Sequence, residues 1–147
     1  MFTVTEVVSI DRPIAEVFDF VGDARNRPQW DSSVISEELT SPEPIGVGST
    51  IHTRMKAVGR EVEFDWRVLE HEPPTGMTIA STSGPMDTTL HFVLTGTDAA
   101  TVVRATIDAN PTGMMRLVEP MISDAVRNNL STGLARVKVI LEGRPTA

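Results

Sequence analysis

The sequence contains no cysteine and no tyrosine, and each absence excludes a kind of chemistry. Without cysteine there is no disulfide, no zinc–thiolate site, no iron–sulfur cluster and no thiol nucleophile. Without tyrosine no phenol can donate a proton to an enolate, so such a step would need another group. The chain also lacks a His-x-x-x-His pair, a clustered carboxylate triad and the full glycine pattern of a nucleotide-binding loop. We therefore expect no metal, no nucleotide and no other cofactor.

Positive charge is scarce as well: 13 basic against 20 acidic residues give a net charge of -7. This charge disfavours nucleic acid and anionic membrane surfaces as partners. No apolar run approaches the roughly 20 residues that span a bilayer, and the N-terminus lacks the pattern of a signal peptide. We therefore expect no membrane-spanning segment and a cytoplasmic location. A length of 147 residues, 40% of them hydrophobic, fits a single domain over residues 1–147.

Turn residues divide the chain into an α+β pattern. Apolar residues with a period of two predict a first strand over residues 2–10. Pro13 then begins a helix that Gly22 ends, and a second short helix is expected to end before Pro28. Gly- and Pro-containing turns separate six further predicted strands, at residues 32–40, 49–57, 60–71, 76–82, 87–95 and 100–109.

The hairpin around Val58-Gly59 can be placed in register from the sequence. A two-residue turn there sets position n opposite position 117 minus n. One face of the hairpin then carries three oppositely charged pairs, Lys56–Glu61, Arg54–Glu63 and His52–Asp65. The other face pairs Met55 with Val62, Thr53 with Phe64, and Ile51 with Trp66. Three charge pairs in succession favour this register, which makes the apolar face the inner side of the sheet.

Residues 111–142 change to helical spacing and predict one long helix with a kink at Pro120. Its apolar stripe, together with strand alternation, predicts the side chains that face a cavity. The predicted ligand-binding residues are Met55, Phe64, Trp66, Met77, Ser81, Phe92, Met121, Ala125 and Asn129. Flexible methionines suit ligands of varied shape, although they also fill ordinary cores. Asn129 could bond a ligand carbonyl or hydroxyl, or equally a strand or a buried water.

Few titratable groups are predicted to face inward. Strand alternation places His52, His71 and His91 on the outer face, where a catalytic role is not expected. Glu6 shares the inward side of Val4 and therefore is the candidate catalytic acid or base. Burial would raise its pKa, whereas a bulge would turn it out to water.

Four segments resemble a known superfamily. They are SIDRPIAEVFDFVGDARNRPQWDSSV (9–34), GVGST (46–50), VLEHEPPTGM (68–77) and GLARVKVILEG (133–143). The chain resembles the START-like (SRPBCC) superfamily, which includes Bet v 1-type proteins and bacterial polyketide cyclase/dehydrase-like proteins. The resemblance implies a helix-grip fold, in which a seven-stranded curved antiparallel sheet and two short helices surround a cavity under a long C-terminal helix.

Three functions remain open at this point. The first is binding of a largely apolar lipid-, quinone- or polyketide-like molecule in a cavity of a few hundred cubic ångströms. The second, implied by the resemblance, is a cofactor-independent polyketide cyclase/dehydrase that promotes ring closure or water loss by acid/base chemistry, with Glu6 as the acid or base and Asn129 positioning a carbonyl. The third is a protein-interaction module, with a homodimer as one form, although the charged outer face argues against a large apolar patch.

Overall fold

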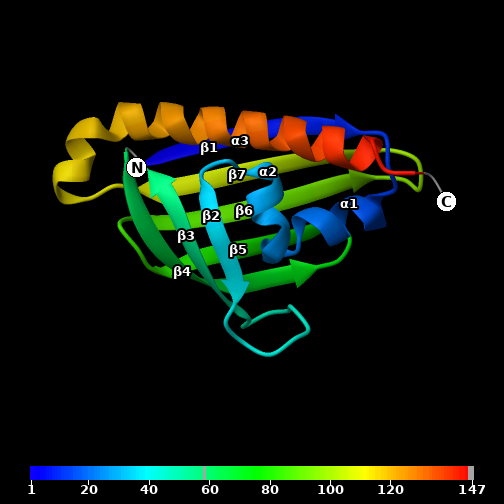
Figure 1. Ribbon diagram of the computed structural model, residues 1–147, viewed down its shortest axis with the longest axis horizontal. Coiled ribbons are helices and arrows are strands. Elements are labelled where there is room, and N and C mark those ends of the chain that lie inside the picture. The colour runs from blue at the N-terminus through cyan, green and yellow to red at the C-terminus, as the bar shows by residue number, and fades with distance from the viewer. Residues whose placement is uncertain (58, 146–147) are drawn as a thin grey trace.

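All seven predicted strands form, and they pair into one antiparallel sheet in the order β1-β7-β6-β5-β4-β3-β2. The computed structural model describes residues 1–57 and 59–145. The sheet curves around one face, and the long C-terminal helix lies across that face (Figure 1). The elements in chain order are β1 (Phe2–Ile10), α1 (Ile14–Val21), η1 (Ala24–Asn26), α2 (Arg27–Trp30), β2 (Val34–Leu39), β3 (Thr50–Ala57), β4 (Arg60–Glu72), β5 (Gly76–Ser83), β6 (Asp87–Gly96), β7 (Thr101–Asn110), η2 (Gly113–Val118) and α3 (Glu119–Glu142). This is the predicted helix-grip fold.

The β3–β4 hairpin has the predicted register, from Thr50 opposite Arg67 to Ala57 opposite Arg60. Of the two predicted turn residues, Val58 lies outside the described residues, and Gly59 has a φ of +74°. The charged face is also present, but some of its contacts run diagonally. His52 contacts Asp65 at 2.7 Å and Glu63 at 3.0 Å, while Arg54 pairs with Glu61.

Two prolines lie in the first turn of a helix, and not at the positions predicted for them. Pro28 was expected to follow the end of a helix, and Pro120 to kink one. Pro28 follows Arg27 at the beginning of α2, and Pro120 follows Glu119 at the beginning of α3. The predicted long C-terminal helix is present, but it is not one continuous α-helix: the 3₁₀ segment η2 comes first, and α3 begins at Glu119. Proline is tolerated in a first turn because the N–H that it lacks has no helical acceptor there.

The prediction that His71 points outward is wrong as well. The register between β4 and β5 shifts between Val68 and Glu70, which inserts one residue and reverses the alternation beyond it. Val68 is buried and Leu69 is exposed, but His71 is half-buried and its ring centroid lies 5.7 Å from that of Phe18.

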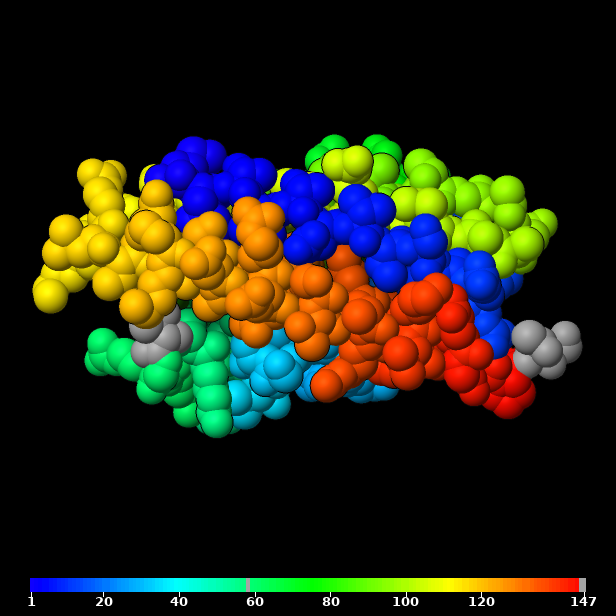
Figure 2. All heavy atoms as spheres, turned by 90° about the horizontal axis from the view of Figure 1, so that it is seen from above, coloured from blue at the N-terminus to red at the C-terminus, as the bar shows by residue number. Residues whose placement is uncertain are grey.

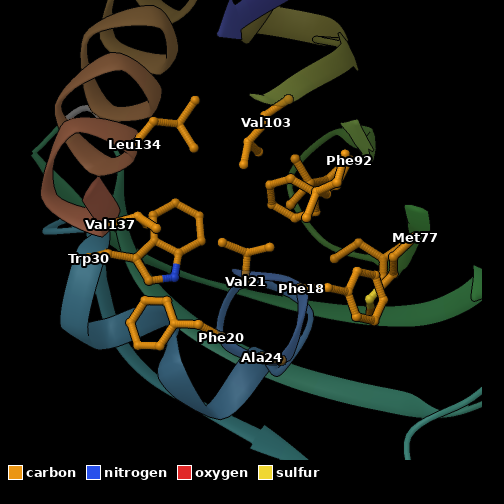
Figure 3. Close-up of a cluster of buried hydrophobic side chains, with 14 of the residues drawn as sticks. Phe18, Phe20, Val21, Ala24, Trp30, Met77, Phe92, Val103, Leu134 and Val137 are labelled. Atoms are coloured by element: carbon orange, nitrogen blue, oxygen red, sulfur yellow. The ribbon is translucent and has the colours of Figure 1, made fainter. Parts of the chain in front are cut away.

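Helix α3 runs the length of the molecule beside β1 (Figure 2). Its middle packs on Trp30, around which Phe20, Val21, Leu134 and Val137 gather (Figure 3). Gly133 allows this close approach, because a Cβ at that position would lie 2.9 Å from Trp30 Cε3 and 3.0 Å from the Trp30 carbonyl oxygen. The core therefore fixes α2 and α3 against each other.

Candidate ligand-binding cavity

A cavity of about 140 Å³ lies between the sheet and the N-terminal half of α3. Its walls come from α2, the end of β3, the interior of β4, the β5–β6 turn, β6, β7, η2 and α3. Most of the side chains that line it are apolar, including Leu90, Ile107 and Ile122. The exposed residues Lys56 and Ala125 line it too, so the cavity reaches the surface.

Five of the predicted ligand-binding residues lie together in this cavity: Met55, Phe64, Trp66, Ala125 and Asn129. Phe64 and Trp66 stack with their ring centroids 5.0 Å apart and an angle of 22° between the rings. The Trp66 Nε1–H donates a hydrogen bond to Thr53 Oγ1 at 3.0 Å, which orients the indole. These two rings form an ordered aromatic wall.

The other predicted residues lie elsewhere. Met77 and Phe92 line a second cavity of about 20 Å³, and the Ser81 hydroxyl accepts a hydrogen bond from the Thr88 N–H at 2.9 Å. Met121, in the first turn of α3, is 60% exposed, whereas Ile122 next to it is buried and lines the larger cavity. Glu6 is half-buried on β1 opposite Ala105 and is not among the residues that line either cavity.

The structure also brings together three charged side chains that the sequence analysis did not single out. Arg27 and Asp31 lie one turn apart around α2, Glu37 lies on β2, and each residue is less than a tenth exposed. Arg27 Nη2 is 3.5 Å from Asp31 Oδ2, and Arg27 Nη1 is 3.6 Å from Glu37 Oε1. Both distances are too long for hydrogen bonds of ordinary strength. We call these three residues the buried charge cluster.

Several polar atoms of the buried charge cluster have no partner within the described part of the chain. They are Nε and Nη1 of Arg27 and both carboxyl oxygens of Glu37; Trp30 Nε1, on the same helix as Arg27, has no partner either. Burial raises the pKa of Glu37 above its ordinary value of 4.5, against the opposing effect of the Arg27 charge. Asp31 is better satisfied, since its Oδ1 accepts hydrogen bonds from the N–H and the hydroxyl of Ser33 at 3.0 and 2.6 Å.

The buried charge cluster joins the two cavities. Arg27 lines both of them, Asp31 lines the larger and Glu37 the smaller. Glu37 faces inward because it pairs with Thr53, which is fully buried on the inner side of β3. A charged anchor thus stands in the wall of an otherwise largely apolar space. No group of three or more histidine, cysteine or acidic side chains among the described residues could hold a metal ion.

A curved antiparallel sheet that grips a long helix over an internal cavity defines the class of START-like, helix-grip proteins. Within that class, the family model described as "Polyketide cyclase / dehydrase and lipid transport" matches residues 1–142. The chain therefore belongs to this family. No protein with a curated description matches the sequence.

Solved structures share the whole architecture. TTHA0849 from Thermus thermophilus superposes with a TM-score of 0.84 at 17% identity, covering 98% of this chain and 100% of that one. The Zhui aromatase/cyclase from a Streptomyces species gives 0.78 at 15% identity, with coverage of 99% and 96%. A START superfamily protein from Mycobacterium smegmatis gives 0.73 at 19%, with coverage of 97% and 95%. At these identities the likeness establishes the fold.

Within the described residues, no helix is long and apolar enough to cross a membrane.

Proposed function

We propose that this protein binds one largely apolar small molecule in the cavity under α3. The observation that carries the proposal is the cavity itself, which is about 140 Å³ in volume, mostly apolar in lining and open at Lys56 and Ala125. An apolar cavity of about 150 Å³ in another protein holds a benzene ring. The space is smaller than the few hundred cubic ångströms that the sequence analysis predicted. A longer lipid-, quinone- or polyketide-like ligand would therefore place one ring or one chain segment inside and the remainder at the mouth.

Membership of the family supports this proposal, because the family description joins polyketide cyclases and dehydrases with lipid transport. These activities share the need to enclose an apolar molecule away from water. The stacked Phe64 and Trp66 supply a rigid face for such a ligand, while Met55 supplies a flexible one.

Intrinsic fluorescence gives a direct binding assay. The sequence has two tryptophans and no tyrosine, and both Trp30 and Trp66 line the cavity. A ligand that enters should therefore change nearly all of the protein's fluorescence in a saturable way. We expect this result on titration with n-octanol or toluene.

A pair of variants localises the signal. Ala125→Phe places a ring at the cavity mouth and should abolish the response, whereas Val139→Phe adds the same ring at a position of α3 that is 72% exposed and should leave it intact. A flat titration with both ligands, or an equal response in the Ala125→Phe variant, would overturn the proposal.

A second candidate, the polyketide cyclase/dehydrase activity, is favoured by Glu37. A buried carboxyl group with a raised pKa, 3.6 Å from an arginine that lines the cavity, is suited to move a proton between carbon and oxygen during aldol closure or water loss. Glu37 lines the smaller cavity beside Arg27, which lines both, whereas Glu6 lies outside both cavities, so Glu37 is the better candidate. With a short poly-β-keto thioester as substrate, Glu37→Gln should abolish turnover and Glu6→Gln should retain it. Loss of activity in the Glu6 variant alone would restore the original assignment.

A further inference from the structure

We propose that Arg27 is the polar anchor of the cavity, and that it selects ligands with a neutral carbonyl group over hydrocarbons and over carboxylates. This inference rests on the proposed function, because it names the class of molecule that the same cavity binds. It is drawn from the hydrogen-bonding needs, the position and the charge balance of the buried charge cluster.

The N–H donors of the Arg27 guanidinium are poorly satisfied. The guanidinium carries five N–H donors, and Nε and Nη1 have no acceptor among the described residues. Its two carboxylate neighbours stand at 3.5 and 3.6 Å, beyond good hydrogen-bond length. Trp30 Nε1, from the same helix, is an additional donor without an acceptor. Buried donors in this condition favour a ligand that brings an acceptor oxygen.

Arg27 is placed where a ligand can reach it. The side chain retains about 10% exposure, and the residue lines both the larger and the smaller cavity. The nearby walls of the larger cavity are formed by apolar side chains such as Leu90 and Leu130. A ligand with an apolar body and one oxygen at its inner end would meet apolar surface along its length and N–H donors at that end.

The charge balance decides which oxygen is preferred. Asp31 and Glu37 already lie within 4 Å of the guanidinium, and Glu37 itself has a pKa raised by burial. A ligand carboxylate would add another acidic group to this poorly solvated cluster, which is unfavourable. A ketone oxygen accepts the same hydrogen bonds and brings no charge. Lys56 is the cation at the exposed rim, where water screens its attraction for anions.

Three ligands of similar size test this selectivity: acetophenone, its hydrocarbon isostere cumene, and benzoate. By isothermal titration calorimetry the wild-type protein should bind acetophenone about tenfold more tightly than cumene, the effect of one net hydrogen bond. Benzoate should bind more weakly than acetophenone. Equal affinities for acetophenone and cumene, or tightest binding of benzoate, would overturn the inference while leaving the proposed function in place. Binding of none of the three would overturn both.

Variants then assign the selectivity to one residue. Arg27→Met should bind cumene and lose the preference for acetophenone, while Arg136→Met, at an exposed position of α3, should retain it. Because removal of Arg27 leaves two acidic neighbours, the double variant Arg27→Met/Glu37→Gln restores the charge balance if the single variant does not fold. A preference that persists without Arg27 contradicts its role.

An infrared measurement on the wild-type protein needs no variant. The carbonyl stretch of bound acetophenone should lie below its frequency in hexane, because hydrogen bonds from Arg27 weaken the C=O bond. An unshifted band would overturn the inference whatever the affinities are.

Discussion

Replacing Gly133 with alanine tests how closely α3 approaches Trp30. The added Cβ would lie 2.9 Å from Trp30 Cε3 and 3.0 Å from the Trp30 carbonyl oxygen, whereas ordinary contacts begin at 3.4 Å. The oxygen belongs to the backbone at the end of α2 and cannot rotate away, so the helix has to move by about half an ångström. Overpacking of this kind costs about 1–3 kcal/mol.

Helix propensity opposes the cost of this close contact. Alanine is a better helix former than glycine by about 1 kcal/mol. Propensity alone would raise the free energy of unfolding by about 1 kcal/mol, and overpacking lowers it by about 1–3 kcal/mol. The expected net change is therefore a loss of about 1 kcal/mol relative to the wild type. Ser131→Ala, at an exposed position of the same helix, is the control: it should gain less than about 0.7 kcal/mol from propensity and makes no new contact.

Urea denaturation followed by circular dichroism measures both variants. If Gly133→Ala is more stable than the wild type by about 1 kcal/mol, the gain equals propensity alone and the close approach of α3 to Trp30 is refuted. A second test places Gly133→Ala in a Trp30→Leu background, where the contact with the ring is gone. The cost should shrink there, since two residues in contact have non-additive effects.

Three further results are expected. Phe64→Leu, which breaks the stack with Trp66 at 5.0 Å, should weaken n-octanol binding several-fold in the fluorescence titration, and unchanged affinity would remove the aromatic wall from the site. Because burial raises the pKa of Glu37, the folded state binds the proton of this carboxyl more tightly than the unfolded chain does. The free energy of unfolding of the wild type should therefore fall relative to that of Glu37→Gln as the pH rises above 4.5. Urea denaturation at a series of pH values measures this, and a rise would contradict the burial of that carboxyl. Hydrogen bonds to Asp65 and Glu63 raise the pKa of His52 in the folded state. The stabilisation from His52 is therefore complete below pH 6.5 and is lost as the pH rises through the folded pKa. In an NMR titration of Asp65→Asn the pKa of His52 should fall toward 6.5, and an unchanged pKa would contradict the contact.

Local patterns in the sequence were enough to predict the sheet. The β3–β4 hairpin could be registered because its turn is two residues long and its opposed charges leave one plausible alignment. The same register placed Met55, Phe64 and Trp66 on the inner face, and all three line the cavity. Turn chemistry bounded the remaining strands to within about two residues.

The buried charge cluster could not be found in this way. The inward direction of Glu37 depends on the pairing of β2 with β3, and the loop over residues 40–49 leaves that register open. A shift between Val34 and Ser36 changes the alternation of β2 as well. Arg27 and Asp31 were assigned to different elements because the sequence analysis ended the second helix before Pro28. Only the assembled tertiary structure brings the three together.

The same dependence on tertiary structure explains the error at His71 and the exposure of Met121. One inserted residue in the pairing of β4 with β5 turned His71 toward Phe18. Helical spacing correctly gave the buried stripe of α3 at Ile122 and Leu130, but it could not show that Met121, in the same turn as Ile122, is 60% exposed. Alternation describes one element, whereas burial depends on what that element packs against.

The most direct test of the proposed binding site is methyl NMR of protein labelled with ¹³C at its seven methionines, recorded with and without n-octanol. Three of them line the cavity, one is buried elsewhere and three are exposed; these are Met55, Met86 and Met115, then Met77, then Met1, Met114 and Met121. Binding under α3 should shift the first three signals together and leave the others in place. Shifts confined to the three exposed methionines would show that the ligand binds at the surface, and would contradict the cavity as the binding site.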